Sequence, residues 1–359
     1  MVPIRVCHVI KTLNLGGAES NLLNLTKVLD PNRFEIHVAY SVGGELEPRF
    51  QVAGIRLFKF ADQSHKLKSL ATFKIVKRLK DYFQKEKIDI VHTHTFNAHV
   101  WGGAAAKLAG CKILEHVHDS RYMDPVDFRR RGETSQQYTM IKYFKNISDC
   151  VVVLTRQNYE FVIENRIYPA QRVWEIQNGI DLSGGKVLSS SEKEKLRNRF
   201  GVSLDQKVVL TPIRFSPEKN LEALFKIVLE VAKKMPNAVC LIAGDGPEKG
   251  NFEVLIKKAG AENQIKTIGF YPDIPKLLNI VDVFLLPSTI ELHSIAIMEA
   301  MRQKVPVVVS QNVGCNDEFI QNWENGILMS PFTVSGWADA IVHLLKDPEL
   351  RMKMGNAGF

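Results

Sequence analysis

The chain has 359 residues, of which 45% are hydrophobic and 24% are charged, so it can bury the cores of about two domains. Its five cysteines lack C-x-x-C spacing, which argues against a disulfide framework or a cysteine-ligated zinc site. No apolar run reaches the roughly 18 residues that span a bilayer, and residues 1–10 lead directly into a strand pattern, so we expect a cytoplasmic protein.

The first half of the chain alternates short β-branched runs with helical patterns. Strands are predicted at residues 4–10, 34–41, 55–60, 88–94, 111–118 and 150–155. Strands that alternate with helices form parallel sheets, because each parallel connection must cross over the sheet. Residues 1–180 are therefore predicted to form a doubly wound, Rossmann-like α/β domain.

The first predicted turn from strand to helix contains Gly16 and Gly17, just before a helix that begins near Ala18. Glycines at such a turn let backbone amides approach an anionic group closely, so both are candidate ligand-binding residues. A tight turn without a ligand explains them equally well. The turn lacks the G-x-G-x-x-G fingerprint of dinucleotide-binding domains, which argues against a nicotinamide oxidoreductase.

The formal net charge of +8 comes entirely from the first half, where residues 1–180 hold 26 basic and 18 acidic residues. Residues 66–87 alone carry eight basic and two acidic residues, and their apolar members at helical spacing are Leu70, Phe73, Val76, Leu79 and Phe83. Together with the arginine triplet at 129–131, this segment predicts binding to an anionic membrane surface. Alternatively, the apolar face packs on its own sheet and leaves an ordinary solvated lysine face.

The second half repeats the alternation, with strands predicted at residues 207–214, 238–246, 265–270, 281–288, 305–311 and 326–331. Residues 205–345 are predicted to form a second Rossmann-like domain. Between the domains lies a Gly/Ser-rich and then charge-rich stretch, residues 181–204. It has little core potential of its own and is predicted to be a linker.

Two basic residues lie where the first strand of the second domain ends. Arg214 and Lys219 are five residues apart across a loop, so both can point toward one ligand. Two fixed cations suit a diphosphate leaving group, whose negative charge grows as it departs. The alternative is a pair of surface bases in salt bridges. Gly244 lies in the tight turn after the next strand, beside the same site.

Two glutamates, Glu291 and Glu299, are separated by seven mostly small or apolar residues. A helix is predicted at 293–304, which places Glu291 just ahead of it and Glu299 about two turns in. Free amides near His293 and Ser294 can receive phosphate oxygens, while carboxylates accept sugar hydroxyls, so the layout suits a nucleotide sugar. Alternatively, Glu291 interacts with the helix dipole and Glu299 is a solvated helix residue.

Nine segments of the chain follow the order and spacing of one family. They are GGAES (16–20), IDIVHTH (88–94), EHVHD (115–119), IQNGID (176–181), RFSPEK (214–219), AGDGP (243–247), the E-x(7)-E of 291–299, PVVVS (306–310) and ENGILMSP (324–331). On these motifs the chain resembles the retaining glycosyltransferases of family 4, which have the GT-B fold. The resemblance implies two Rossmann-like domains facing across a cleft, the first on the acceptor side and the second binding the nucleotide sugar. Residues 346–359 are expected to start a crossover segment that continues further in relatives.

The resemblance also assigns roles to individual residues. It implies that Glu291 contacts the donor sugar and that Glu299 holds the ribose hydroxyls. Arg214 and Lys219 match the pair that holds the diphosphate.

His118 matches a position that lies beside the donor sugar in many relatives. The nearby His92 and His94 alternate on a strand, so we expect at most one of them to face the site. Leu292 and Lys304 stand where the family commonly has glycine, which leaves the sugar preference open.

The mechanism implied is transfer of a glycosyl group from a nucleotide diphosphate sugar to an acceptor hydroxyl with retained anomeric configuration. The base is expected to contact backbone groups around Gly269 and Phe270. No D-x-D motif is present, so we expect no metal and no cofactor. The resemblance implies that the departing phosphate helps to deprotonate the acceptor. The expected acceptor is a saccharide or a lipid-linked molecule in cell-envelope, extracellular polysaccharide or glycolipid synthesis, at the inner face of the cell membrane. No nucleic acid partner is expected.

Two other functions remain open at this point. A nucleotide-sugar epimerase can share the two-domain architecture, and it would convert the donor without an acceptor. A catalytically inactive nucleotide-sugar-binding protein would bind the donor without turnover.

Overall fold

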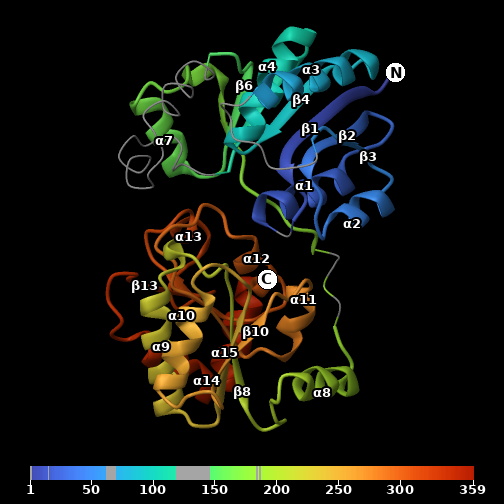
Figure 1. Cartoon of the computed structure of the whole chain (residues 1–359). Helices are drawn as coiled ribbons and strands as arrows, with labels where there is room; N and C mark the ends of the chain where they lie inside the picture. The colour runs from blue at the N-terminus through green and yellow to red at the C-terminus, as the bar shows by residue number, and fades with distance from the viewer. Residues whose placement is uncertain (1, 15, 62–69, 119–145, 183–184, 186) are drawn as a thin grey trace. The chain divides into compact units, whose positions relative to one another are not determined.

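The computed structural model describes residues 2–14, 16–61, 70–118, 146–182, 185 and 187–359. These residues form two compact units, Met1–Gly179 and Ile180–Phe359. Each unit is built on a parallel sheet with helices packed on it (Figure 1). Both are Rossmann-like and of the α/β class, which confirms the predicted fold class.

The first unit has a seven-stranded parallel sheet in the order β3-β2-β1-β4-β5-β6-β7. Its strands are β1 (Ile4–Thr12), β2 (Phe34–Val42), β3 (Arg56–Lys59), β4 (Ile90–His94), β5 (Lys112–Val117), β6 (Cys150–Val153) and β7 (Val173–Glu175). Its described helices are α1 (Gly17–Val28), α2 (Glu47–Val52), α3 (Leu70–Lys85), α4 (Phe96–Ala109), α7 (Arg156–Glu164) and the 3-10 turn η2 (Ala170–Arg172). All six predicted strands are present. Strand β7 was not predicted, because three residues at a sheet edge are too few to show a pattern.

The second unit has a six-stranded parallel sheet in the order β10-β9-β8-β11-β12-β13. Its strands are β8 (Lys207–Pro212), β9 (Ala238–Ala243), β10 (Ile265–Gly269), β11 (Val283–Leu286), β12 (Val307–Ser310) and β13 (Ile327–Met329). Its helices are α8 (Ser190–Arg199), η4 (Pro217–Lys219), α9 (Leu221–Lys234), α10 (Lys249–Lys258), α11 (Ile274–Leu277), η5 (Leu278–Ile280), α12 (Ile295–Arg302), α13 (Asn316–Phe319), α14 (Trp337–Lys346) and α15 (Pro348–Gly358). Every residue of β9, β11 and β12 is buried, as expected for strands covered by helices on both faces.

The segment predicted as a linker differs from that expectation. Most of its second half forms helix α8, which starts with a capping box in which Ser189 and Glu192 bond reciprocally. Leu188, Leu196 and Val202 are buried in the core of the second unit. The prediction of little core potential was wrong here because three apolar side chains spread among charged residues show no clear period.

The last helix, α15, belongs to the second unit and packs against α12 and α14. Met354 is buried in the core, and the guanidinium of Arg351 lies 3.4 Å from the carboxylate of Asp282. A side chain at Gly355 would overlap the carbonyl oxygen of Lys304, so this helix packs closely. The residues predicted to start a crossover segment therefore contribute to the core of their own unit.

Helix α3 holds the basic segment noted in the sequence. Ile75, Leu79 and Phe83 are buried in the core of the first unit, so most of the apolar face packs on its own sheet. Phe73 is instead 78% exposed. The arginine triplet at 129–131 lies outside the described residues. Among the residues that the structure describes, no helix has both the length and the apolar character to cross a membrane.

Candidate active site

Both sheets reverse their winding between two central strands. In the first unit β1 lies between β2 and β4, and in the second unit β8 lies between β9 and β11. Crossovers leave toward opposite faces at such a switch point, so the loops at the carboxyl ends of the two strands diverge and leave room for a ligand. The predicted charged residues follow β8 and β11, which places them at the switch point of the second sheet.

The structure brings Lys219 and Glu291 together at this point. Lys219 ends η4, after β8, and Glu291 lies in the loop between β11 and α12. The Nζ of Lys219 donates to Oε1 of Glu291 over 2.5 Å, and the two side chains are only 19% and 12% exposed. A half-buried charge-assisted hydrogen bond is stronger than an exposed one, so it holds both side chains in place.

Arg214 lies in the same loop as Lys219, but its side chain is exposed. Among the described residues it forms no ion pair, so its guanidinium is available to a ligand. The carbonyl oxygen of Arg214 accepts from the backbone N–H of Ser216 over 2.8 Å, which tightens the turn into η4. The structure therefore places the two predicted cations in one loop without bringing them into contact.

Asn220 and Thr289 fasten this loop to its neighbours, and sequence reasoning missed both. Asn220 adopts the left-handed conformation, and its Nδ2 donates to the carbonyl oxygens of Pro287 at 3.1 Å and Pro331 at 2.9 Å. Thr289 donates its backbone N–H to the carbonyl oxygen of Glu218 over 3.0 Å. Asparagine tolerates the left-handed region, so an asparagine at this position could have indicated from the sequence that the chain turns here.

Two glycines allow close approach of backbone segments at the site. Gly244 has φ +145°, and a Cβ there would overlap the carbonyl oxygen of Ile213. Gly314 has φ +60°, and a Cβ there would overlap the carbonyl oxygen of Leu292, in the loop that carries Glu291. A larger residue at either position would displace a loop of the site.

The predicted base-contacting residues lie at the end of the neighbouring strand β10. The carbonyl oxygen of Gly269 accepts from the N–H of Gly244 over 2.7 Å, which joins the loops that follow β9 and β10. Phe270 is 43% exposed.

Helix α12 begins at Ile295, two residues later than predicted, with Ser294 as its N-cap. The unbonded amides of its first turn are therefore those of residues 295–297 rather than those near His293. Ser294 makes no side-chain capping bond, and His293 is buried with its ring 5.3 Å from that of Phe319. Burial lowers the pKa of His293 to about 4, so this imidazole is neutral at physiological pH.

Glu299 lies about one turn into α12 rather than two. Burial raises its pKa to about 7, and the nearby charge of Arg302 partly opposes that shift. The alternative of an ordinary solvated helix residue does not fit this environment. A carboxyl group that is only partly ionised at neutral pH gains from a ligand whose hydroxyls donate to it.

In the first unit, strands β1, β4 and β5 and the residue directly after β5 bring five histidines together. We call them the histidine cluster: His8, His92, His94, His116 and His118. The rings of His92 and His94 lie 4.3 Å apart, so the premise that these two side chains alternate between faces was wrong. Residues two positions apart on a strand point to the same face, and both therefore join the cluster.

The predicted residue His118 directly follows β5 and is half-buried. Its Nε2 lies 2.9 Å from Nδ1 of His94, whose Nε2 lies 3.0 Å from Nδ1 of His8. Burial is the main cause that lowers the pKa of all three, and neighbouring imidazoles lower it further. His118 is therefore neutral and hydrogen-bonded at physiological pH.

Gly16 and Gly17 stand at the start of α1, with Gly16 as the N-cap. The carboxylate of Glu19 folds back over Gly16 and accepts from Oγ1 of Thr12 over 2.8 Å. Burial raises the pKa of Glu19. An anionic ligand at this helix start would have to displace that carboxyl group, so the structure favours the tight-turn alternative.

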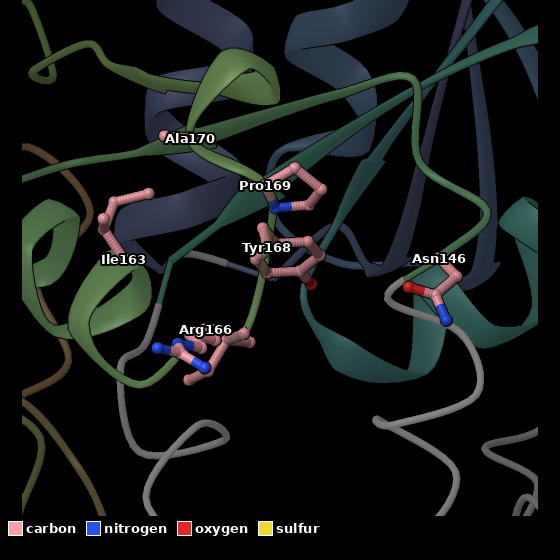
Figure 2. A pocket seen from close by; sticks show the side chains of 7 residues that line it. Asn146, Ile163, Arg166, Tyr168, Pro169 and Ala170 are labelled. Carbon is pink, nitrogen blue, oxygen red and sulfur yellow. The ribbon is translucent and has the colours of Figure 1, made fainter.

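A surface pocket of the first unit lies elsewhere, between α7 and η2 (Figure 2). It is lined by Asn146, Ile163, Arg166, Ile167, Tyr168, Pro169 and Ala170. None of the predicted site residues lines it.

Two doubly wound units, the second with a charged pair at its switch point, define a protein of the GT-B class. The family models agree, because Glycosyltransferase Family 4 matches residues 15–183 and Glycosyl transferases group 1 matches residues 192–359. The chain therefore belongs to the family 4 glycosyltransferases, as its motifs indicated.

Curated relatives are similar over most of their length. The UDP-Gal:alpha-D-GlcNAc-diphosphoundecaprenol alpha-1,3-galactosyltransferase of Escherichia coli is 25% identical, covering 98% of this chain and 91% of the relative. The alpha-monoglucosyldiacylglycerol synthase of Acholeplasma laidlawii is also 25% identical, covering 94% and 86%. Among solved structures, Anabaena Alr3699/HepE in complex with UDP and glucose superposes with a TM-score of 0.84 at 24% identity, covering 99% of this chain and 93% of that one.

Proposed function

We propose that the protein transfers a glycosyl group from a nucleotide diphosphate sugar to an acceptor hydroxyl, with retention of the anomeric configuration. The observation that carries this proposal is the Lys219–Glu291 pair at the switch point of the second sheet, just ahead of α12. A cation and free helix amides at one sheet edge match the diphosphate of such a donor, and the carboxylate beside them matches the hydroxyls of its sugar.

Each residue then has a separate task. Lys219, Arg214 and the first amides of α12 bind the diphosphate and stabilise its charge as the glycosidic bond breaks. Glu291 accepts hydrogen bonds from hydroxyls of the donor sugar and holds Lys219 in place before the donor arrives. Glu299 accepts from the ribose, whose hydroxyls favour its ionised form.

The nucleobase is proposed to bind backbone groups around Gly269 and Phe270. Their loop is joined to that of Gly244, which places the base-binding backbone next to the β8 and β9 loops. The neutral imidazole of His118 is proposed to lie beside the donor sugar, where its Nδ1, which is not bonded to His94, can form a hydrogen bond with a hydroxyl group.

The reaction is proposed to need no magnesium ion, because Lys219, Arg214 and the α12 amides supply the positive potential that a cation supplies elsewhere. The departing phosphate oxygen takes the proton of the acceptor hydroxyl as the new glycosidic bond forms on the same face. No protein nucleophile is required for this route.

The acceptor is proposed to be a saccharide or a lipid-linked molecule, used in synthesis of the cell envelope, an extracellular polysaccharide or a glycolipid. Two relatives are named for products or substrates with lipid parts, diphosphoundecaprenol and diacylglycerol. The basic face of α3, with exposed Lys74 and Lys77 beside exposed Phe73, is proposed to attract the protein to anionic lipid at the inner face of the membrane.

A two-stage experiment tests the proposal. A thermal-shift panel of nucleoside diphosphates and their sugars should find one donor class that raises Tm by mass action. The stabilising donor is then incubated with and without candidate acceptors, without added magnesium, and the anomeric configuration of the product is read by NMR. A glycosylated acceptor with retained configuration is expected.

Other outcomes would replace the proposal. Conversion of the donor alone into an epimer would favour the epimerase alternative. Donor binding without turnover on any acceptor would favour the inactive binding protein, and inversion of configuration would contradict the retaining route.

A further inference from the structure

The histidine cluster places five imidazoles on three adjacent strands. His8 on β1 is directly opposite His92 on β4, and His94 on β4 is opposite His116 on β5. Strands β1 and β4 run side by side in the first unit (Figure 1). All four side chains are more than nine-tenths buried, with exposures of 1%, 8%, 0% and 7% in the order His8, His92, His94, His116.

Several ring nitrogens in the cluster have no hydrogen-bond partner. They include Nε2 of His8, Nε2 of His92 and both ring nitrogens of His116. A buried polar atom without a partner is destabilising, so a group that binds the unpartnered nitrogen of His92 would stabilise the unit. Neutral imidazole binds metal ions through either ring nitrogen, so each ring of the cluster offers a ligand atom.

We propose that His8, His92 and His94 bind one transition-metal ion, and that Zn²⁺ is the ion their chemistry suits best. Each offers one ring nitrogen, and the three nitrogens lie within 4.8 Å of one another. Nδ1 of His8 and Nε2 of His94 are 3.0 Å apart, close to the separation of about 3.3 Å between two ligands of a tetrahedral zinc ion. The ion replaces the proton that these two nitrogens otherwise share.

The ligand set selects the class of ion. Imidazole nitrogens bind Zn²⁺, Cu²⁺ and Ni²⁺, whereas Mg²⁺ and Ca²⁺ require oxygen ligands, and no carboxylate takes part in this trio. Sequence reasoning missed the site because it searched for cysteine pairs and a D-x-D motif, while these ligands come from strands 84 residues apart in the register His8↔His92.

A second trio, His94, His116 and His118, offers nitrogens at similar separations, and both trios need His94. The first trio is favoured because binding through Nε2 of His94 leaves its Nδ1–H to donate to Nε2 of His118 over 2.9 Å. A metal ligand commonly donates its other ring nitrogen to a neighbour, which fixes the tautomer of both rings. The site would thus hold the proton of His118 on Nδ1. The role of His118 rests on the proposed function, whereas the metal site does not.

The test uses the full-length protein with any affinity tag removed, stripped with a chelator and titrated with Zn²⁺ by calorimetry. The wild type is expected to bind one Zn²⁺ per chain. His8→Gln and His92→Gln should each weaken that binding by about 100-fold or more, because each removes a ligand. Two matched controls should keep wild-type affinity: His37→Gln, a buried imidazole bonded to Tyr82, and His343→Gln in the second unit.

Cobalt gives a readout that does not depend on whether a variant folds. In the wild type loaded with Co²⁺, paramagnetically shifted imidazole N–H resonances count the histidine ligands, and at least three are expected. A fourth shifted imidazole resonance would indicate that His116 also binds the ion. Absence of stoichiometric Zn²⁺ binding by the wild type, fewer than three shifted imidazoles, or undiminished binding in both ligand variants would each overturn the proposal. Failure of the glycosyltransferase assays would leave this result unaffected.

Discussion

The two sheets have the same strand order apart from the extra strand β7 of the first, yet their central strands carry different chemistry. In the second unit, the loops after β8 and β11 hold Lys219 and Glu291, a charged pair 2.5 Å apart. In the first unit, β1 and β4 carry His8, His92 and His94, whose pKa values are lowered by burial so that the rings are neutral. The winding of a sheet therefore decides where a site can form, and a few side chains at strand ends decide what it can bind.

The two units also differ in how their buried hydrophobic residues cluster. Among the residues that the structure describes, one continuous hydrophobic cluster fills the second unit, while those of the first unit form three separate clusters. A charged site needs rigid support, and the loops of Lys219 and Glu291 are joined by the hydrogen bonds of Asn220 and Thr289. Removing charge from each unit in turn tests how far their chemistry differs.

The largest effect is expected from removing the cations of the second unit. Lys219→Ala and Arg214→Ala should each lower turnover about 100-fold or more, because each removes a preorganised group that stabilises the leaving diphosphate. Steady-state kinetics with saturating donor measure the loss. Lys226→Ala, which removes an exposed lysine paired with Glu222, is the matched control and should keep normal turnover. Near-normal rates in both site variants would contradict the assignment of the diphosphate.

A smaller effect should separate the two glutamates. Glu299→Ala should weaken the binding of free nucleoside diphosphate and of the intact donor alike, by about 10-fold, because Glu299 contacts the ribose present in both ligands. Glu291→Ala should leave the binding of the free nucleoside diphosphate unchanged and weaken the binding of the intact donor, because only the donor carries the sugar. Calorimetry with both ligands on both variants distinguishes them. Equal losses of affinity for both ligands in both variants would show that Glu291 and Glu299 do not have distinct roles.

The raised pKa of Glu299 predicts a pH effect on stability. Its pKa is about 7 in the folded state and near 4.5 when unfolded, so the folded protein holds the proton more tightly. The stability of the wild type should therefore fall between about pH 5 and about pH 8, by about 2 kcal/mol relative to Glu299→Gln, and level off above that range. Urea denaturation of both proteins across this range measures the difference. Parallel pH profiles for the two would show that Glu299 has an ordinary pKa.

The smallest effect concerns the basic face of α3, which carries part of the excess charge of the first unit. Liposome flotation should show binding that needs anionic lipid and falls with added salt. Binding should drop several-fold when Lys74, Lys77, Arg78 and Lys80 become Gln. Arg78 already donates to the carbonyl oxygen of Phe60 over 3.3 Å, and Lys77 pairs with Asp81 over 2.8 Å, so we expect Lys74 to contribute most. Flotation that ignores lipid charge, or that never occurs at low salt, would favour the solvated-face alternative.

Much of the fold could be predicted from the sequence, because strands of a doubly wound sheet are continuous apolar runs separated by turn residues. The runs at 238–246, 281–288 and 305–311 became β9, β11 and β12, whose residues are all buried. The short edge strand β7 and the helix α8 could not be predicted in this way, because their few apolar residues find partners only in the folded unit.

The sequence by itself determined which charged residues stand at strand ends, since position after a parallel strand is a local property. Lys219 and Glu291 are 72 residues apart, however, and the order of β8 and β11 in the sheet decided that they pair. The raised pKa of Glu299 and the gathering of five histidines were likewise decided by tertiary structure. Burial and proximity depend on which strands become neighbours in the sheet, and the order of the strands along the chain does not specify this.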